Sequence, residues 1–239
     1  RLLKFIGKNR QFFLINDIYM YLDFLDPIDR EIILSKKFEK LEIDFLIKEI
    51  EKKKINYFLD VGANCGYYSL KIAKDVSSIS VFSFEPNPEA YLKFSKSLEK
   101  NLELSKKVKL ENFGLSNESK KLKMQSMIKF GYAQTGGSSV ITNDKNNDNY
   151  KFYANFKTGD EYFNIRNKNL AIKIDVEGHE LNVLNGLEKT LKFNNCILQI
   201  EIFSNNFEKV DNFLLSLGYN NFYKIQKRSN HFYANFNTW

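Results

Sequence analysis

The sequence has few of the residues that mark disulfide-rich, metal-binding or membrane-spanning proteins. Its 239 residues include two cysteines, two histidines, three prolines and one tryptophan. Cys65 and Cys196 form neither a metal-ligand spacing nor a disulfide framework, so we expect a reducing, cytoplasmic location. No apolar run approaches the length of a membrane span, and residues 1–15 lack the continuous apolar segment of a signal peptide. Because the chain begins with Arg rather than Met, we leave room for a preceding segment.

Linkers rich in proline, glycine or serine are also lacking, as are internal repeats. With 43% hydrophobic and 27% charged residues, a chain of this length can bury a full core. The first 54 residues differ from the rest in their hydrophobic pattern. We therefore predict an N-terminal hairpin and helical extension over residues 1–54, packed on a core domain over residues 55–239.

The net charge is +7, and such an excess is one feature of nucleic-acid-binding proteins. Here, however, lysines alternate with glutamates along an expected helix. The alternating residues are Lys93, Lys96 and Lys100 with Glu89, Glu99 and Glu103. We therefore interpret these lysines as part of solvated helix faces and do not expect nucleic acid as a partner.

The extension and the core show different element patterns. Strand-like runs over residues 11–15 and 18–24 flank Asn16-Asp17, which suits a hairpin turn. A helical period over residues 29–53 slips near Phe38, which predicts two helices. From residue 57 onward, apolar runs alternate with helical patterns, which favours a parallel sheet covered on both faces. The expected strands cover residues 57–61, 80–84, 108–113, 170–176 and 197–203, and the expected helices cover 67–76, 88–104, 180–193 and 207–217.

The last two runs, over residues 221–227 and 231–236, are joined by only three residues, so we expect an antiparallel hairpin. The sequence thus predicts an α/β fold with a seven-stranded, mostly parallel sheet. A long insert over about residues 118–169 separates the third and fourth core strands, and inserts of that size are usually functional or form a small subdomain.

The first core strand ends in a glycine turn, Asp60-Val61-Gly62-Ala63-Asn64-Cys65-Gly66-Tyr67. Gly62 and Gly66 bracket the kind of turn that lets a ligand approach the backbone. A dinucleotide fingerprint would place glycine at position 64 and keep carboxylates away from the pyrophosphate. Asn64 and Asp60 instead favour S-adenosylmethionine, since its ammonium and sulfonium groups are cationic. An ordinary strand-to-helix turn is the alternative explanation of the glycine pair alone.

The next two strand ends supply polar groups to the same edge of the sheet. Glu85 follows the second strand at roughly the spacing at which such folds place an acid on ribose hydroxyls. The third strand runs into Asn112-Phe113-Gly114-Leu115-Ser116. There, Asn112 and the backbone near Gly114 and Leu115 could contact an adenine edge.

The fourth strand carries charge where a central strand should be apolar, in Lys173-Ile174-Asp175-Val176-Glu177-Gly178-His179-Glu180. Lys173 and Asp175 share a face and form either a structural ion pair or a functional pair at the carboxyl end of the sheet. His179 could accept a proton from a substrate hydroxyl, or simply start a helix. Glu177 could orient His179 or bind substrate. The acidic residues show no diagnostic metal spacing, so we predict no metal.

Together these motifs resemble the FkbM-type methyltransferases. The matching stretches are residues 60–67, 84–86, 112–116, 173–180 and 183–186, and Phe38-Glu39 and residues 136–139 also fit. The resemblance implies a class I methyltransferase (Rossmann-like) fold, with S-adenosylmethionine as cofactor and S-adenosylhomocysteine as product. The cofactor-binding residues it implies are Glu39, Asp60, Gly62, Ala63, Asn64, Gly66, Tyr67, Glu85, Pro86, Asn112, Gly114, Leu115 and Asp175. The catalytic candidates are Lys173, Asp175, Glu177 and His179.

The resemblance further implies O-methylation of a hydroxyl on a sugar or glycan, a glycolipid or a natural product. We therefore expect a small-molecule or glycan acceptor, and consider a homodimer as one form of assembly. Two alternatives stay open: an RNA 2′-O-methyltransferase, suggested by the basic charge, and a non-catalytic nucleoside-binding protein. Against RNA, the sequence has no separate RNA-binding module and no clear aromatic and basic stacking patch.

Overall fold

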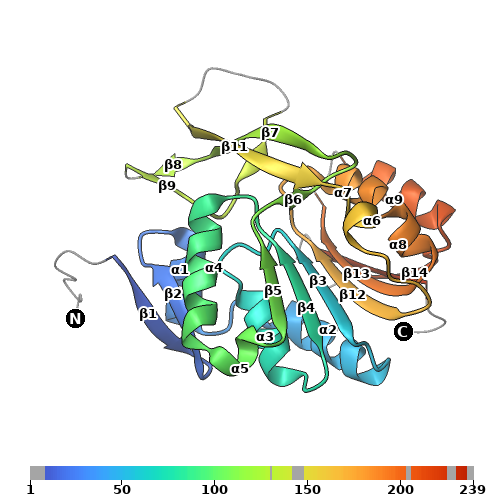
Figure 1. The fold of residues 1–239 in the computed structure, drawn as a ribbon, viewed down its shortest axis with the longest axis horizontal. Helices are drawn as coiled ribbons and strands as arrows, with labels where there is room; N and C mark the ends of the chain where they lie inside the picture. Colours follow the sequence, from blue (N-terminus) through green and yellow to red (C-terminus); the bar gives the residue numbers. More distant parts are fainter. Residues whose placement is uncertain (1–8, 130, 142–147, 203–205, 225–229, 236–239) are drawn as a thin grey trace.

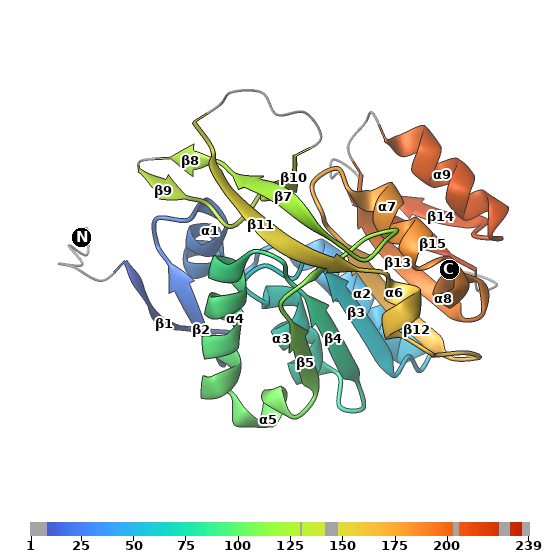
Figure 2. The same ribbon diagram turned by 45° about the horizontal axis from the view of Figure 1, so that its top comes forward.

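The computed structural model describes residues 9–129, 131–141, 148–202, 206–224 and 230–235. A central sheet carries helices on both faces, and a smaller sheet stands at one end of its strands (Figures 1 and 2). No helix in these described ranges is long and apolar enough to cross a membrane.

The central sheet has seven strands, in the order β14–β15–β13–β12–β3–β4–β5. Their bounds are Asn221–Lys224 (β14), Asn230–Ala234 (β15), Asn195–Glu201 (β13), Asn169–Ile174 (β12), Tyr57–Val61 (β3), Ser80–Phe84 (β4) and Val108–Glu111 (β5). All pairs from β13 to β5 are parallel, whereas β15 lies antiparallel between β13 and β14. The expected mostly parallel sheet with an antiparallel C-terminal hairpin is therefore confirmed. The expected strand residues 203, 225–227 and 236, and the turn at 228–229, lie outside the described residues.

Alternating residues of the parallel strands bury two separate cores, one on each face of the sheet. Phe58 packs with α1 (Pro27–Ser35), α2 (Lys40–Lys52), α3 (Tyr67–Asp75) and α4 (Pro88–Lys100), while its neighbour Leu59 packs with α7 (Glu180–Gly186), α8 (Glu188–Lys192) and α9 (Phe207–Ser216). Both strand side chains are fully buried, and each such burial contributes about 1.5–3 kcal/mol to the free energy of folding.

Two expected helices are broken. The helix predicted over residues 88–104 ends at Lys100, because Asn101 leaves the helical conformation and its side chain bonds the Ser97 and Tyr19 carbonyls; a short helix α5 (Leu102–Ser105) follows. The helix predicted over residues 180–193 divides at Leu187, directly after Gly186 packs against the Ser116 carbonyl. Both breaks depend on contacts with distant segments, which hydrophobic periodicity does not encode.

The N-terminal extension contains the expected hairpin and two helices. Strands β1 (Arg10–Ile15) and β2 (Ile18–Asp23) pair antiparallel, and both turn residues, Asn16 and Asp17, have positive φ, as a two-residue hairpin turn of this type requires. Lys36, with φ of 52°, ends α1 before the start of α2. Met20 and Leu46 from this segment lie in the same core as Phe58, so the extension shares its hydrophobic core with the sheet.

The insert forms a second sheet, in the order β10–β7–β11–β6, with a separate β8–β9 hairpin. Its elements are β6 (Gly114–Leu115), β7 (Lys120–Ser126), β8 (Ile128–Lys129), β9 (Tyr132–Ala133), β10 (Ser139–Val140), β11 (Tyr150–Lys157) and the short helix α6 (Gly159–Tyr162). Because β6 pairs with β11, the second sheet begins before residue 118, where the insert was expected to start. Residues 130 and 142–147 of the insert lie outside the described residues.

One surface prediction is wrong. Lys93 was interpreted as part of a solvated helix face, but it is 1% exposed and forms an ion pair with Asp29. The partner comes from the N-terminal extension, so the sequence of α4 alone gives no sign of it.

Candidate functional site

A cavity of about 340 Å³ lies at the carboxyl ends of β3, β4 and β12. This is the edge at which open α/β sheets bind ligands, and the volume is in the range of small-molecule sites. The extension and the insert supply its remaining walls, through Ile28 and Glu31 on one side and Met124 and Phe156 on the other. Every predicted site residue lines this cavity except Gly66 and Asn112.

The two glycines of the β3 turn are required by the protein itself. A Cβ at Gly62 would lie 1.9 Å from the Asp175 carbonyl oxygen, and one at Gly66 would lie 2.3 Å from the Phe94 ring. Both glycines have φ near +83°, a conformation that other residues adopt at a cost. Gly62 therefore gives room to the Asp175 carbonyl and Gly66 to the Phe94 ring of α4. Gly62 also lines the cavity, and its role in ligand approach stays a prediction.

Asp60, two residues before Gly62, and Asn64, between the two glycines, place buried polar atoms at the cavity. Asp60 is 1% exposed, and its Oδ2 accepts a 2.6 Å hydrogen bond from Ser69. Asp60 Oδ1 and Asn64 Oδ1 are buried and accept no hydrogen bond from any residue that the structure describes. Since a buried polar atom without a partner costs about 1–3 kcal/mol, two of them lining one cavity indicate a ligand with hydrogen-bond donors.

Glu85 is held between two strand ends. Its Oε2 accepts from the backbone amide of Asn64 at 2.7 Å, and its Oε1 accepts from the amide of Asn87 at 2.7 Å. Burial raises the pKa of Glu85 to about 7, although both amide donors act in the opposite direction. Each carboxylate oxygen keeps a lone pair for a further donor, as a ribose-binding acid requires.

The predicted adenine-contacting residues are divided. Gly114 and Leu115 line the cavity, but Asn112 does not; its amide nitrogen donates to the Glu85 carbonyl at 2.9 Å. Asn112 thus fixes the backbone of Glu85 and does not face the cavity. Pro86 lines the cavity beside Glu85.

Lys173 lies in the buried centre of the site. Its Nζ is 2.7 Å from Asp175 Oδ2 and 4.8 Å from the centroid of the Tyr68 ring. Burial lowers the pKa of Lys173, but the carboxylates of Asp175, Asp60 and Glu39 raise it more, so the ammonium remains charged. Glu39, whose φ is +42°, accepts a 2.7 Å hydrogen bond from the Tyr68 hydroxyl and lines the cavity as expected.

Glu177 is the most unusual carboxylate of the cavity. Its backbone has a φ of +51°, and strain of this kind in a residue other than glycine clusters at functional sites. No described residue donates a hydrogen bond to its side chain. Burial, followed by the charges of Asp175 and Glu201, raises the pKa of Glu177 to about 7.

His179 is held by a residue to which no role was assigned. Its Nε2 lies 2.9 Å from the hydroxyl of Ser116, and its ring packs edge-on against Phe156. Burial, with the charge of Lys120, lowers the pKa of His179 to about 4, so the imidazole is neutral near pH 7. Among the described residues, no group of three or more His, Cys, Asp or Glu is arranged to hold a metal ion.

Comparison with known proteins decides the family. The model of the methyltransferase FkbM domain matches residues 60–220. The chain belongs to this family. Methyltransferase 1 of Beauveria bassiana (strain ARSEF 2860) is 25% identical over 178 residues, which cover 62% of this chain and 69% of that protein.

A solved structure supports the same fold. The crystal structure of methyltransferase FkbM from Methylobacillus flagellatus KT matches with a TM-score of 0.55 at 15% identity. The match covers 75% of this chain but 43% of that one, so this chain spans less than half the length of that relative. The predicted class I methyltransferase fold is thereby confirmed. The family match includes the turn at Asp60, the strand end at Glu85 and the Lys173–Glu180 segment.

Proposed function

We propose that the protein is an S-adenosylmethionine-dependent O-methyltransferase that acts on a neutral hydroxyl of a sugar, glycan, glycolipid or natural product. The observation that carries this proposal is the cavity itself, which combines buried acceptors at Asp60 and Asn64 with the carboxylate of Glu85. Family membership supports the same chemistry.

The lining residues fit this cofactor. Asp60 and Asn64 offer buried oxygens to an ammonium group, and Glu85 offers a carboxylate to ribose hydroxyls. Glu39 and the pair of Lys173 and Asp175 complete the charged wall. When bound, S-adenosylmethionine supplies an electrophilic methyl group on a cationic sulfur.

The charge of the cavity favours a neutral acceptor over a polyanion. The carboxylates of Glu31, Glu177 and Glu201 also line the cavity. Lys173 is the single lysine or arginine that lines the cavity in the described part of the chain, and Asp175 already pairs with it. A phosphate or a nucleic-acid backbone would meet the carboxylates of Glu31 and Glu177 here. This argues against the RNA 2′-O-methyltransferase alternative.

Glu177 fits the role of the base better than His179. The pKa of about 7 lets the Glu177 carboxylate take a proton from an acceptor hydroxyl near neutral pH. His179 takes up a proton only in acid, since its pKa is lowered to about 4, and Ser116 already occupies its Nε2. Of the four catalytic candidates, Glu177 is therefore the proposed base and His179 is a positioning residue. Lys173 and Asp175 form a buried ion pair that contributes charge to the site.

A methyl-transfer screen tests the proposal. The protein is incubated with isotopically labelled S-adenosylmethionine and panels of neutral glycans, glycolipids, phosphorylated sugars and structured RNA. Transfer to a neutral hydroxyl, abolished in Glu177→Gln while S-adenosylhomocysteine still binds, supports it. Transfer to RNA alone, or full activity in Glu177→Gln, contradicts the acceptor class or the proposed base, respectively. Cytoplasmic location and a homodimer stay predictions from the sequence.

A further inference from the structure

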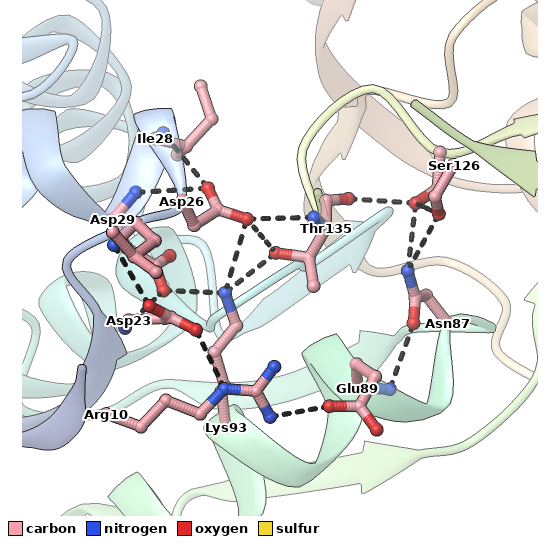
Figure 3. A network of polar contacts seen from close by, with 12 residues as sticks. Arg10, Asp23, Asp26, Ile28, Asp29, Asn87, Glu89, Lys93, Ser126 and Thr135 are labelled. Atoms are coloured by element: carbon pink, nitrogen blue, oxygen red, sulfur yellow. Dashed lines mark hydrogen bonds and ion pairs between the residues drawn. The ribbon is translucent and has the colours of Figure 1, made fainter. Parts of the chain in front are cut away.

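A buried lysine joins three segments that are far apart in the sequence (Figure 3). Lys93 of α4 places its Nζ 2.6 Å from Asp29 Oδ2 and 3.8 Å from Asp26 Oδ2, and donates a 2.7 Å hydrogen bond to the Thr135 hydroxyl. Asp26 and Asp29 belong to the start of α1 in the N-terminal extension, and Thr135 belongs to the insert. The contact therefore links the core domain to both the N-terminal extension and the insert.

Thr135 bonds with its amide, its hydroxyl and its carbonyl at this junction, whereas Asp29 Oδ1 is buried with no hydrogen-bond partner among the described residues. The backbone amide and the hydroxyl of Thr135 donate to Asp26 Oδ2 at 2.8 and 3.0 Å, so the hydroxyl oxygen remains free to accept from Lys93. The other oxygen of Asp26 accepts from the amide of Ile28 and caps α1. The charge of Lys93 and the Thr135 hydrogen bonds lower the pKa of Asp26 against the effect of its burial.

The segment that follows Thr135 is fixed at its other end as well. The Asn87 amide nitrogen donates to the Ser138 hydroxyl at 2.9 Å, and that hydroxyl donates to the Thr135 carbonyl at 3.0 Å. The backbone amide of Asn87 bonds Glu85. Residues 135–138 all line the cavity, and a Cβ at Gly137 would lie 3.7 Å from Oε1 of Glu177. The segment therefore forms a cavity wall between the proposed ribose-binding acid and the proposed base.

We propose that Thr135 is a positioning residue, which, through Asp26 and Lys93, holds residues 135–138 as the outer wall of the cavity. The N-terminal extension thereby becomes part of the binding site. Burying three charges costs desolvation energy, and apolar replacements of similar volume are often equally stable, so stability alone does not account for the arrangement. The claim that this wall belongs to the binding site rests on the proposed function. The claim that Thr135 holds residues 135–138 in place does not.

The test uses a pair of isosteric substitutions. Thr135→Val removes the hydroxyl, which bonds Lys93 and Asp26, and keeps the side-chain shape. Thr190→Val is the matched control: Thr190 is also buried, and its amide and hydroxyl donate to Asp160 Oδ1 at 2.8 and 2.7 Å, away from the cavity lining. Thr135→Ser keeps the hydroxyl and serves as the rescue.

We expect Thr135→Val to speed amide hydrogen exchange over residues 135–140 roughly tenfold in the free protein, and to weaken S-adenosylhomocysteine binding in calorimetry by roughly tenfold. Thr135→Ser restores both values, and Thr190→Val changes neither, although it lowers the melting temperature similarly. Unchanged exchange in Thr135→Val, or the same loss of binding in Thr190→Val, overturns the inference. If the unmodified protein binds no S-adenosylhomocysteine, the proposed function fails, while the exchange measurement still decides whether Thr135 holds the wall.

Discussion

The backbone amide of Asn64 donates a 2.7 Å hydrogen bond to Oε2 of Glu85, which joins the turn after β3 to the end of β4. A second amide, from Asn87, holds the other oxygen at 2.7 Å. The carboxylate is thus oriented by backbone groups on both sides before any ligand is present. Such preorganisation lowers the entropy cost of binding, which is why Glu85 is central to the cofactor assignment.

Replacing Glu85 by Gln should weaken S-adenosylhomocysteine binding by roughly 10- to 100-fold. Hydrogen bonds to a charged group contribute about 1.5–3 kcal/mol, and the amide side chain also places a donor against one of the two backbone amides. The measurement is calorimetry at pH 8, above the pKa of about 7. Glu89→Gln is the control, because Glu89 lies in the first turn of α4, does not line the cavity, and bonds Arg10. Equal losses in both variants would remove Glu85 from the cofactor site.

The methyl-transfer rate should rise with pH and level off above about pH 7, since the ionised form of Glu177 accepts the proton. Glu177→Gln is expected to lower kcat by roughly 10²–10⁴-fold and to abolish this inflection. His179→Gln is expected to lower the rate less and to keep the inflection, because the pKa of His179 lies near 4. A profile that loses its inflection only in His179→Gln would assign the base to the histidine.

Ionisation of Glu177 should lower the stability of the folded protein as the pH rises toward 7. The pKa of Glu177 is higher in the folded state than its usual value of 4.5, so the folded protein binds more protons and loses stability as pH rises through 4.5–7. Glu177→Gln should therefore be more stable than the unmodified protein at pH 8, by about 1–2 kcal/mol after allowance for partial solvent screening, and of similar stability at pH 4. Urea unfolding at both pH values measures the difference. A stabilisation that is equal at both values would exclude the electrostatic explanation.

Gly62→Ala should destabilise the fold by about 3 kcal/mol or more, because a left-handed backbone and a contact of 1.9 Å with the Asp175 carbonyl oppose the new methyl group. Gly218→Ala is the matched control. Gly218 has a similar φ of +86°, but no atom lies within 4 Å of its Cβ position, so only the backbone cost of about 1 kcal/mol is expected. Thermal unfolding compares the two variants. Similar losses would mean that the close approach of β3 and β12 does not constrain position 62.

The sequence predicted what depends on local pattern. Apolar runs locate the core strands, and acidic residues at their carboxyl ends, such as Asp60 within β3 and Glu85 directly after β4, reach the cavity because parallel strands end at one edge. It did not predict contacts made across the chain. Ser116 beside His179 and Thr135 beside Lys93 carry no local signal, since each acquires its role from a partner that folding brings near. For the same reason the sequence did not show that the Asp175 carbonyl lies where a Cβ of residue 62 would be.

Calorimetry of the unmodified protein with S-adenosylmethionine, S-adenosylhomocysteine and NAD tests the central claim most directly. We predict saturable binding of the first two, weakened in Asp60→Ala, and no binding of NAD, because the Asp60 carboxylate near the end of β3 repels its pyrophosphate. Binding of NAD alone, or S-adenosylhomocysteine binding that Asp60→Ala leaves unchanged, would contradict the assignment of this cavity.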